Sequence, residues 1–251
     1  PHGTLNKEDS MKLYGINKWA NENDFGIVIN IHMNDHARRK LNLPGEYYGF
    51  AIYVPEKQYG NAESSSVVGI FISNRLSKFL PSSTLPKESG GVVPDQDLIA
   101  IGRYNTAKTA SILVEYGYVY EPMYRTKELR ELILNEFAYQ TYLGVEEFFG
   151  EEHTNNRFTS LPYKFNFPIK KEKPNEEVLL LQLALISEGY YPPQGRDFEE
   201  CPLSGIFAGC SKAALEEFQK NNSLEVNGIF DQKTVEKINQ PKDLFTNQRV
   251  N

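Results

Sequence analysis

Segments of two kinds alternate along the first 150 residues of the chain. Apolar runs suited to buried strands occur at 25–32, 48–55, 97–101 and 110–119, and helical spacing of apolar side chains occurs at 8–23, 61–80 and 126–149. Strands that alternate with amphipathic helices form a mostly parallel sheet with helices on its faces. Residues 1–150 are therefore predicted to form an α/β domain.

The pattern changes after residue 150. Residues 151–175 are polar, interrupted by prolines and without a steady period, which predicts a linker. Phe158, Phe165 and Phe167 are too many aromatic residues for a free coil, so we expect the linker to pack partly on its neighbours. Residues 176–240 show short helical patterns that predict a small three-helix domain, and 241–251 are expected to be a loose tail.

A short internal repeat lies within the predicted three-helix domain. The segment Gly-Ile-Phe at 205–207 recurs at 228–230, and Ser211 and Thr234 each follow six residues after the glycine. In both copies this order predicts a glycine turn, a buried phenylalanine and a hydroxyl residue that opens a short helix.

Composition and charge argue against two kinds of partner. The formal net charge is −6, and Lys and Arg do not gather in a stripe, so nucleic acid is a poor candidate. No apolar run approaches the roughly 20 residues that a membrane-spanning helix needs. The chain begins without an initiator methionine, and we expect residues to be missing upstream. The sequence leaves the oligomeric state open.

The two cysteines, Cys201 and Cys210, are nine residues apart with a proline and two glycines between them. They could close a small loop as a disulfide or remain as two buried thiols. The pair lacks the doubled C-x-x-C spacing of a structural zinc site. A disulfide would indicate an oxidising, extracytoplasmic setting.

Two polar side chains stand out because they lie in or at the end of apolar strands. Glu115 interrupts the run 110–119, where a carboxylate is costly unless it is paired or bound to a cation. His32 ends the run 25–32. If these two strands are parallel neighbours, both side chains emerge at the same edge of the sheet, as in a hydrolytic zinc site with Glu115 as general base and acid. The alternatives are a hydrogen-bonded strand-end histidine, and a glutamate that pairs with Arg103 or points outward at a strand end.

Four sequence signatures then occur in order: "VINIHMND", "YGFAIYV", "DLIAI" and "SILVEYGYV". With them, residues 4–149 resemble the catalytic domain of zinc-dependent N-acetylmuramoyl-L-alanine amidases, the amidase type 3 family. In that family two histidines and one glutamate hold Zn²⁺, and a further glutamate is the catalyst. The resemblance implies that His32 is the last histidine ligand and that Glu115 activates the zinc-bound water. That water would cleave the amide between N-acetylmuramic acid and L-alanine of peptidoglycan, and Glu115 would protonate the departing amine.

The chain departs from the family pattern before His32. Too few residues precede it to hold the first strand and its connections, so the other two ligands are expected upstream of this chain. His2 and Glu8 are the alternative candidates for those ligands. "GYVYEP" also replaces the family's "GF-x-S-N". The candidates for substrate binding are Asn34, His36 and Arg103, with Arg38 and Arg39 near anionic wall polymer.

The second half carries its own resemblance. Residues 176–240, with "LQLAL", "ALEEFQKNNSLEVNGIF" and "KTVEKI", are similar to the type 1 peptidoglycan-binding domain of bacterial wall hydrolases. The usual "FG" after each glycine is replaced by Phe207-Ala208 and Phe230-Asp231, and "PPQGRDFEECPL" lengthens the first turn. The resemblance implies that peptidoglycan is the partner and that the protein acts in a bacterial cell wall or periplasm.

Three functions therefore compete. A cell-wall amidase is the leading hypothesis. A zinc carboxypeptidase or endopeptidase acting on the stem peptide would use the same pair of residues, because zinc with one glutamate serves either bond. A non-catalytic peptidoglycan-binding protein would need neither residue.

Overall fold

The computed structural model describes residues 7–37, 43–95, 97–98, 101, 109–150, 164–165 and 174–240, with the backbone alone at 7–11 and 13. The chain divides into two compact units, one of residues 1–121 and 140–151, the other of residues 122–139 and 152–251. The long helix α3 (Lys127–Phe148) contributes residues to both units.

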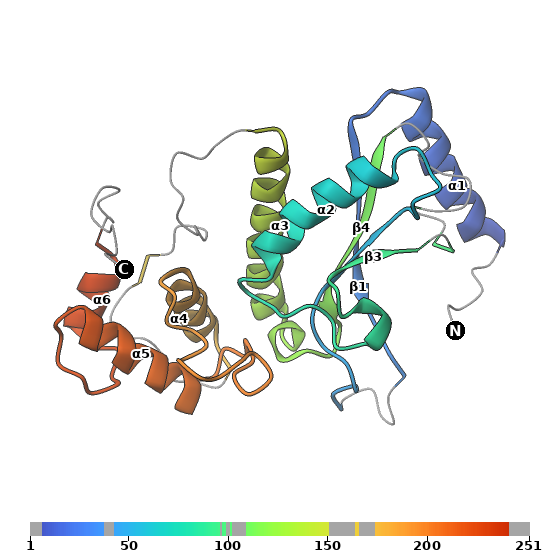
Figure 1. Ribbon diagram of the computed structural model, residues 1–251. Helices are drawn as coiled ribbons and strands as arrows, with labels where there is room; N and C mark the ends of the chain where they lie inside the picture. Colours follow the sequence, from blue (N-terminus) through green and yellow to red (C-terminus); the bar gives the residue numbers. More distant parts are fainter. Residues whose placement is uncertain are drawn as a thin grey trace. The chain divides into compact units, whose positions relative to one another are not determined.

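A four-stranded sheet forms the centre of the first unit (Figure 1). Its strands are β1 (Ile27–Asn34), β2 (Ala51–Val54), β3 (Val92–Pro94) and β4 (Ala110–Tyr118), in the order β1-β4-β2-β3. β1 pairs with β4 and β2 with β3 in parallel, whereas β2 and β4 are antiparallel. The predicted mostly parallel sheet is therefore confirmed. The strands that carry His32 and Glu115 are parallel neighbours, which is the condition under which both side chains emerge at one edge of the sheet.

The sheet differs from the sequence prediction in two places. The short strand β3 was not predicted, because three residues are too few to show a strand period. Residues 97–101 were predicted as a strand, but the described residues at 97, 98 and 101 lie outside any strand.

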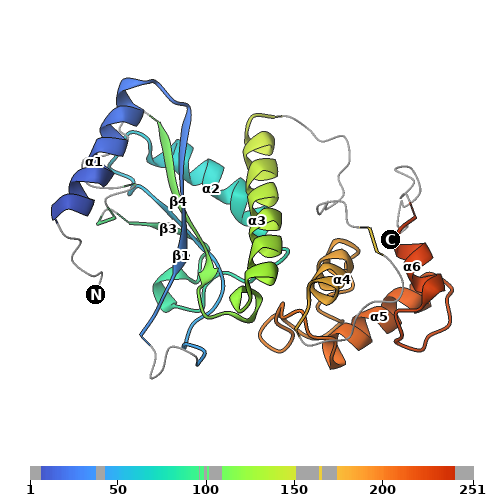
Figure 2. The ribbon, with the colours of Figure 1, turned by 180° about the vertical axis from the view of Figure 1, so that it is seen from behind.

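The helix α2 (Ala62–Leu76) and the end of α3 cover one face of this sheet (Figures 1 and 2). The predicted helices are confirmed as α1 (Lys7–Glu22), α2 (Ala62–Leu76) and α3. α2 rests directly on β2 and β3, because a Cβ added at Gly69 would lie 3.4–3.5 Å from side-chain atoms of Ile52, Val54 and Val92. No helix among the described residues is both long and apolar enough to cross a membrane.

The end of α3 packs equally closely on α2. A Cβ at Gly144 would come within 2.8 Å of the Cα of Ile72, so a glycine is needed at this crossing. Nearby, Arg75 of α2 forms an ion pair with Glu147 of α3. These contacts fix α2 and the end of α3 as one layer on the sheet.

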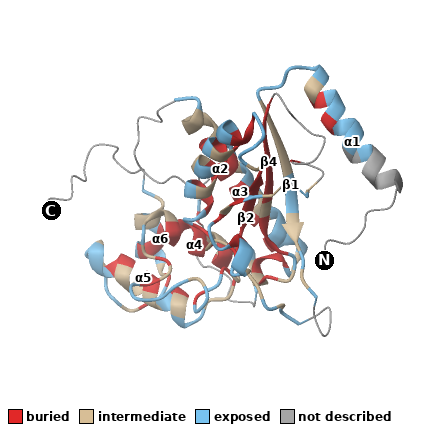
Figure 3. Cartoon of the chain, turned by 45° about the vertical axis from the view of Figure 1, so that its right-hand side comes forward, coloured by how far each residue is buried: buried red, intermediate tan, exposed pale blue. Residues whose placement is uncertain are grey.

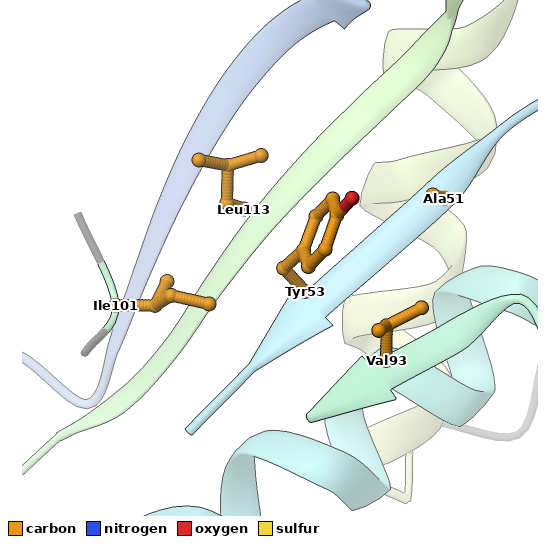
Figure 4. Packing of buried hydrophobic residues seen from close by; sticks show 5 residues of the cluster. All are labelled: Ala51, Tyr53, Val93, Ile101 and Leu113. Atoms are coloured by element: carbon orange, nitrogen blue, oxygen red, sulfur yellow. The ribbon is translucent and has the colours of Figure 1, made fainter. Parts of the chain in front are cut away.

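The opposite face of the sheet carries a separate apolar cluster, shown in Figure 4. Its members are Ala51, Tyr53, Val93, Ile101 and Leu113, with Leu98 packed against them. Side chains alternate between the faces of a strand, so Ala51 and Tyr53 point away from the face that Ile52 and Val54 present to α2.

Burial follows the position of each strand in the sheet. Every residue of β2 is buried and nearly every residue of β4, whereas β1 is half-buried to exposed and α1 is largely exposed (Figure 3). β4 is a central strand with two neighbours, and its nearly continuous apolar run is typical of that position.

In the second unit, α4 (Glu176–Ser187), α5 (Gly209–Asn221) and α6 (Gln232–Ile238) are the three predicted helices. The prediction that Ser211 and Thr234 open helices is wrong. α6 begins after Asp231, whose side chain accepts a hydrogen bond from the backbone N–H of Thr234 at 2.8 Å, and α5 begins after Ala208. Of the two repeated phenylalanines, Phe230 is buried and Phe207 is half-buried.

Instead, the two hydroxyl residues are buried partners of two glutamines. Gln182 of α4 and Gln219 of α5 each accept, through Oε1, the backbone N–H groups of a repeated glycine and of the residue before it. Their Nε2 atoms donate to the carbonyl of the following isoleucine and to the hydroxyl of Ser211 or Thr234. Each glutamine thus ties one Gly-Ile-Phe turn to the preceding helix.

Part of the expected linker packs on this unit. The backbone N–H and C=O of Phe165 form hydrogen bonds of 2.9 and 2.8 Å with the side-chain amide of Asn239. The Phe165 ring lies 5.4 Å from that of Phe230. The expected packing is confirmed for Phe165, while Phe158 and Phe167 lie outside the described residues.

Cys201 and Cys210 form a disulfide, which resolves the choice between a disulfide and two thiols. Cys201 lies at the end of the inserted segment and is fully buried, and Cys210 lies in the first turn of α5. The bond therefore ties the inserted segment to α5.

Loss of this disulfide is expected to destabilise the second unit. The two cysteines are nine residues apart in the chain. Closing a loop of this length lowers the conformational entropy of the unfolded chain, which stabilises the folded state by about 2.5 kcal/mol. We expect dithiothreitol to lower the midpoint of thermal unfolding of the wild-type protein, measured by calorimetry. The double variant Cys201→Ala, Cys210→Ala should unfold at that lower midpoint with or without reductant. Equal midpoints for oxidised and reduced wild-type protein would contradict this role.

Candidate active site

The pairing of β1 with β4 brings His32 and Glu115 together. The two residues are direct partners across the parallel ladder, and Ala51 of β2 is the partner of Glu115 on its other side. Opposite residues of a ladder project from the same face of a sheet, so His32, Glu115 and the apolar cluster share one face. His32 is exposed and Glu115 is half-buried.

Glu115 has an unusual environment for a carboxylate. Its Oε2 atom is buried and has no hydrogen-bond partner among the described residues. This burial, together with the negative charge of Glu88, raises the pKa of Glu115 to about 7. A carboxylate with a pKa near neutrality can accept a proton and return it within one reaction cycle.

The pKa of His32 is shifted in the opposite direction. Partial desolvation lowers the pKa of its imidazole below the ordinary value of 6.5. The ring is therefore mainly neutral at pH 7, which is the form that binds a metal ion.

Glu88 is a fully buried carboxylate, and the sequence analysis missed it. It lies at the end of the short helix η1 (Pro86–Glu88) and is 1% exposed. It accepts hydrogen bonds from the hydroxyls of Tyr53 and Tyr118, the latter at 3.1 Å, and lies 3.4 Å from Nδ2 of Asn34. No apolar run surrounds Glu88 in the sequence, so nothing local marks it as buried.

Two of the predicted substrate-binding residues lie just beyond this pair. Asn34 ends β1, where its Oδ1 accepts a hydrogen bond of 2.9 Å from the backbone N–H of Asp35. His36 follows, and its ring stands edge-on to Tyr47 with the ring centres 4.8 Å apart. The structure thus places both residues at the end of β1 on which His32 lies; their roles in binding remain predictions.

The remaining predicted residues cannot be located at the site. His2, Arg38, Arg39 and Arg103 lie outside the described residues, and Glu8 is described only as a backbone position in α1. Pairing of Glu115 with Arg103 therefore stays a prediction.

A catalytic zinc ion usually has three protein ligands and one open position. Among the described residues no group of three or more His, Cys, Asp or Glu side chains is placed to hold a metal ion. His32 suits one ligand position, because its imidazole is exposed and mainly neutral at pH 7. A complete zinc site would need its other ligands from outside the described residues.

Another buried carboxylate, Glu121, connects the end of β4 to the residues before β2. Its Oε1 accepts hydrogen bonds from the backbone N–H groups of Tyr118 at 2.8 Å and Gly49 at 3.1 Å. Burial raises the pKa of Glu121 to about 7 despite these two bonds, which favour the charged form.

Glu121 should make stability depend on pH. A carboxyl group with a raised pKa in the folded state favours folding below its unfolded pKa, and that contribution is lost as the pH rises toward 7. Glu121→Gln keeps an oxygen for both N–H groups and cannot ionise. The free energy of unfolding of the variant, relative to that of the wild type, should increase by about 3 kcal/mol as the pH is raised from 4.5 to 8, measured by urea unfolding. The exposed control Glu63→Gln should change little, and a constant difference for Glu121→Gln across this range would refute the assignment.

Comparisons with known proteins found matches for both halves of the chain. Residues 174–238 match the family model described as "Putative peptidoglycan binding domain", which confirms the predicted C-terminal domain. No curated protein matches the chain in a sequence search. Similar solved structures include the N-acetylmuramyl-L-alanine amidases Ami1 of Mycobacterium smegmatis (21% identity) and of Mycobacterium abscessus (19% identity), and the CwlD amidase of Clostridioides difficile (16% identity).

These structural similarities are distant and partial. The TM-score is 0.43 for all three structures. The matches cover 56%, 55% and 59% of this chain and 61%, 61% and 68% of the respective relatives. The chain therefore spans about three fifths of the length of the two Ami1 structures.

Proposed function

We propose that this protein is a cell-wall hydrolase that cleaves the amide between N-acetylmuramic acid and L-alanine of peptidoglycan. The observation that carries the proposal is the direct pairing of His32 with Glu115, whose Oε2 is buried without a partner among the described residues. A hydrolase of this kind needs a group that moves protons beside a group that can bind a metal ion.

In this proposal Glu115 performs both proton transfers. As a carboxylate it takes a proton from the attacking water, and as a carboxylic acid it gives that proton to the departing amine of L-alanine. A pKa near 7 suits both steps, because each form is then accessible at neutral pH. The buried cluster around Leu113 and Tyr53 supports β4 and β2 below Glu115, which limits its movement.

Zinc is the proposed cofactor, with His32 as one ligand. When bound, zinc lowers the pKa of water and polarises a carbonyl group. The sequence resemblance supports zinc, and the neutral, exposed imidazole of His32 is compatible with it. The remaining ligands are expected outside the described residues, and upstream residues of a longer protein are the leading candidates.

The C-terminal unit supports peptidoglycan as the partner, because residues 174–238 match a peptidoglycan-binding family. A binding domain of this kind would hold the hydrolase on its polymeric substrate and raise the effective concentration of scissile bonds. The Cys201–Cys210 disulfide agrees with an extracytoplasmic location in the wall or periplasm of a bacterium.

The proposal can be tested by analysing the products that the full-length protein releases from purified peptidoglycan. An amidase creates new L-alanine amino termini, which can be labelled and identified by mass spectrometry. Release of D-alanine would instead indicate the carboxypeptidase, and a new amino terminus within the stem peptide would indicate the endopeptidase. If the protein binds peptidoglycan in zinc-supplemented buffer but creates no new terminus, the result would indicate a non-catalytic peptidoglycan-binding protein.

A further inference from the structure

Four aromatic side chains form a continuous group at the end of β1 and β4, which we call the aromatic rim: His36, Tyr47, Tyr118 and Tyr120. Tyr47 lies 4.8 Å from His36 and 6.4 Å from Tyr118, and Tyr118 lies 5.4 Å from Tyr120, all measured between ring centres. Tyr118 is buried, whereas His36, Tyr47 and Tyr120 keep part of their surface in solvent. The proposed proton transfers assign no role to these rings, and among them only His36 is a predicted substrate-binding residue.

The rim adjoins the candidate active site. Tyr118 is the ladder partner of Asn34, two residues beyond His32, and its hydroxyl donates to Glu88. Glu88 is also the carboxylate whose charge acts on Glu115. The rim is therefore linked through Tyr118 to Glu88, which acts electrostatically on Glu115.

The loop that carries Tyr47 is held in place by several contacts. The hydroxyl of Tyr120 donates to the backbone carbonyl of Tyr47 at 2.7 Å, and a Cβ added at Gly45 would lie only 2.2 Å from the Tyr120 ring. On the other side, Tyr48 and Thr84 exchange hydrogen bonds of 3.0 and 3.2 Å. A loop whose backbone is fixed in this way loses little conformational entropy when a ligand stacks on the ring that it carries.

Carboxylates adjoin the pair of rings formed by His36 and Tyr47. Desolvation, together with the charge of the exposed neighbour Glu46, raises the pKa of the Tyr47 phenol. Asp35 is exposed next to His36, whose backbone N–H it binds at 2.9 Å. An aromatic face bordered by carboxylates is complementary to a sugar ring, whose C–H groups form an apolar face and whose hydroxyls point outward. The negative face of an aromatic ring attracts such polarised C–H groups.

We infer that Tyr47 is the stacking platform of a saccharide subsite beside Glu115. This inference rests on the proposed function, in which the bond to be cleaved has a sugar on one side and a peptide on the other. The rim would bind an N-acetylhexosamine ring of the glycan strand, and Asp35 and Glu46 would accept hydrogen bonds from its hydroxyls. The subsite would thus select substrates that carry the glycan strand over free peptides.

Binding can be tested without any hydrolysis. The probe is chitotetraose, a chain of four N-acetylglucosamine units that lacks the scissile amide, titrated calorimetrically into the full chain. We expect Tyr47→Leu, which keeps the apolar bulk without the π face, to weaken binding at this site about 5- to 10-fold. Tyr47→Phe should retain it, and the exposed control Tyr142→Leu on α3 should not change it.

The outcomes separate the subsite from the proposed function. Unchanged binding by Tyr47→Leu, equal weakening by Tyr47→Phe, or no chitotetraose binding by the wild type would each overturn the subsite. So would a stem pentapeptide, rather than chitotetraose, losing affinity in Tyr47→Leu. Binding that depends on Tyr47 in a protein that creates no new L-alanine termini would support the subsite and refute the amidase. Amide cleavage by a protein whose chitotetraose binding does not depend on Tyr47 would support the amidase and refute the subsite.

Discussion

Glu115→Gln should reduce peptidoglycan hydrolysis by the full-length protein about 10³-fold, the contribution expected of a general base and acid. Glutamine has nearly the same shape as glutamate, but it cannot accept a proton from water and return it to an amine. Since the substitution also removes a buried carboxyl group with a raised pKa, the fold should be retained. The loss should therefore appear in kcat, measured by the rate of formation of L-alanine amino termini, with KM little changed.

Two companion variants make this result specific. Glu63→Gln changes an exposed glutamate of α2 in the same way and should keep the wild-type rate. His32→Ala should lower the zinc content of the dialysed full-length protein, because it removes a proposed ligand, whereas Glu115→Gln should leave that content nearly unchanged. A Glu115→Gln enzyme that keeps more than about a tenth of the wild-type kcat would remove Glu115 from the proposed mechanism.

Gln219→Leu should have the largest effect on stability. The side chain is fully buried and bonds to the backbone N–H groups of Asn227 and Gly228 at 3.1 and 2.9 Å. It also donates to the carbonyl of Ile229 at 2.9 Å and to the hydroxyl of Thr234 at 3.1 Å. Leucine fills the same space but leaves these groups unpaired, which we expect to cost the second unit about 4 kcal/mol.

Amide hydrogen exchange of the full chain would measure this loss in the second unit itself. Peptides from α5 and α6 should exchange faster in Gln219→Leu, while peptides from β4 should keep their wild-type rates. Gln232→Leu, on the exposed side of α6, is the matched control and should change exchange little. Because Gln182 holds the first turn in the same way, Gln182→Leu should raise exchange in α4 and α5. Wild-type exchange in Gln219→Leu would show that the turn does not depend on this residue.

The sequence alone determined features whose signals are local. The helical spacing of apolar side chains predicted α1, α2 and α3, and the continuous apolar runs predicted β1 and β4. The repeated Gly-Ile-Phe predicted a pair of similar turns before α5 and α6. Glu115 was found for the same reason, since a charge within an apolar run is visible without any knowledge of the fold.

Tertiary structure decided features that depend on contacts between distant residues. Glu88 and Asn34 are 54 residues apart in the chain, and no periodicity in either segment indicates that they meet. The antiparallel pairing of β2 with β4 and the short strand β3 likewise depend on long-range hydrogen bonds.

The candidate site shows the same division. His32 and Glu115 could each be chosen from the sequence, but only the register of β1 on β4 makes them direct neighbours. A shift of one residue would turn one of the two side chains to the opposite face of the sheet. The Gly-Ile-Phe turns show the same division. Their glycines are visible in the sequence, whereas the glutamines that bind them lie on the preceding helices. Local patterns thus supplied the chemical groups, and long-range packing placed them in contact, because burial and hydrogen bonding are satisfied only in the complete fold.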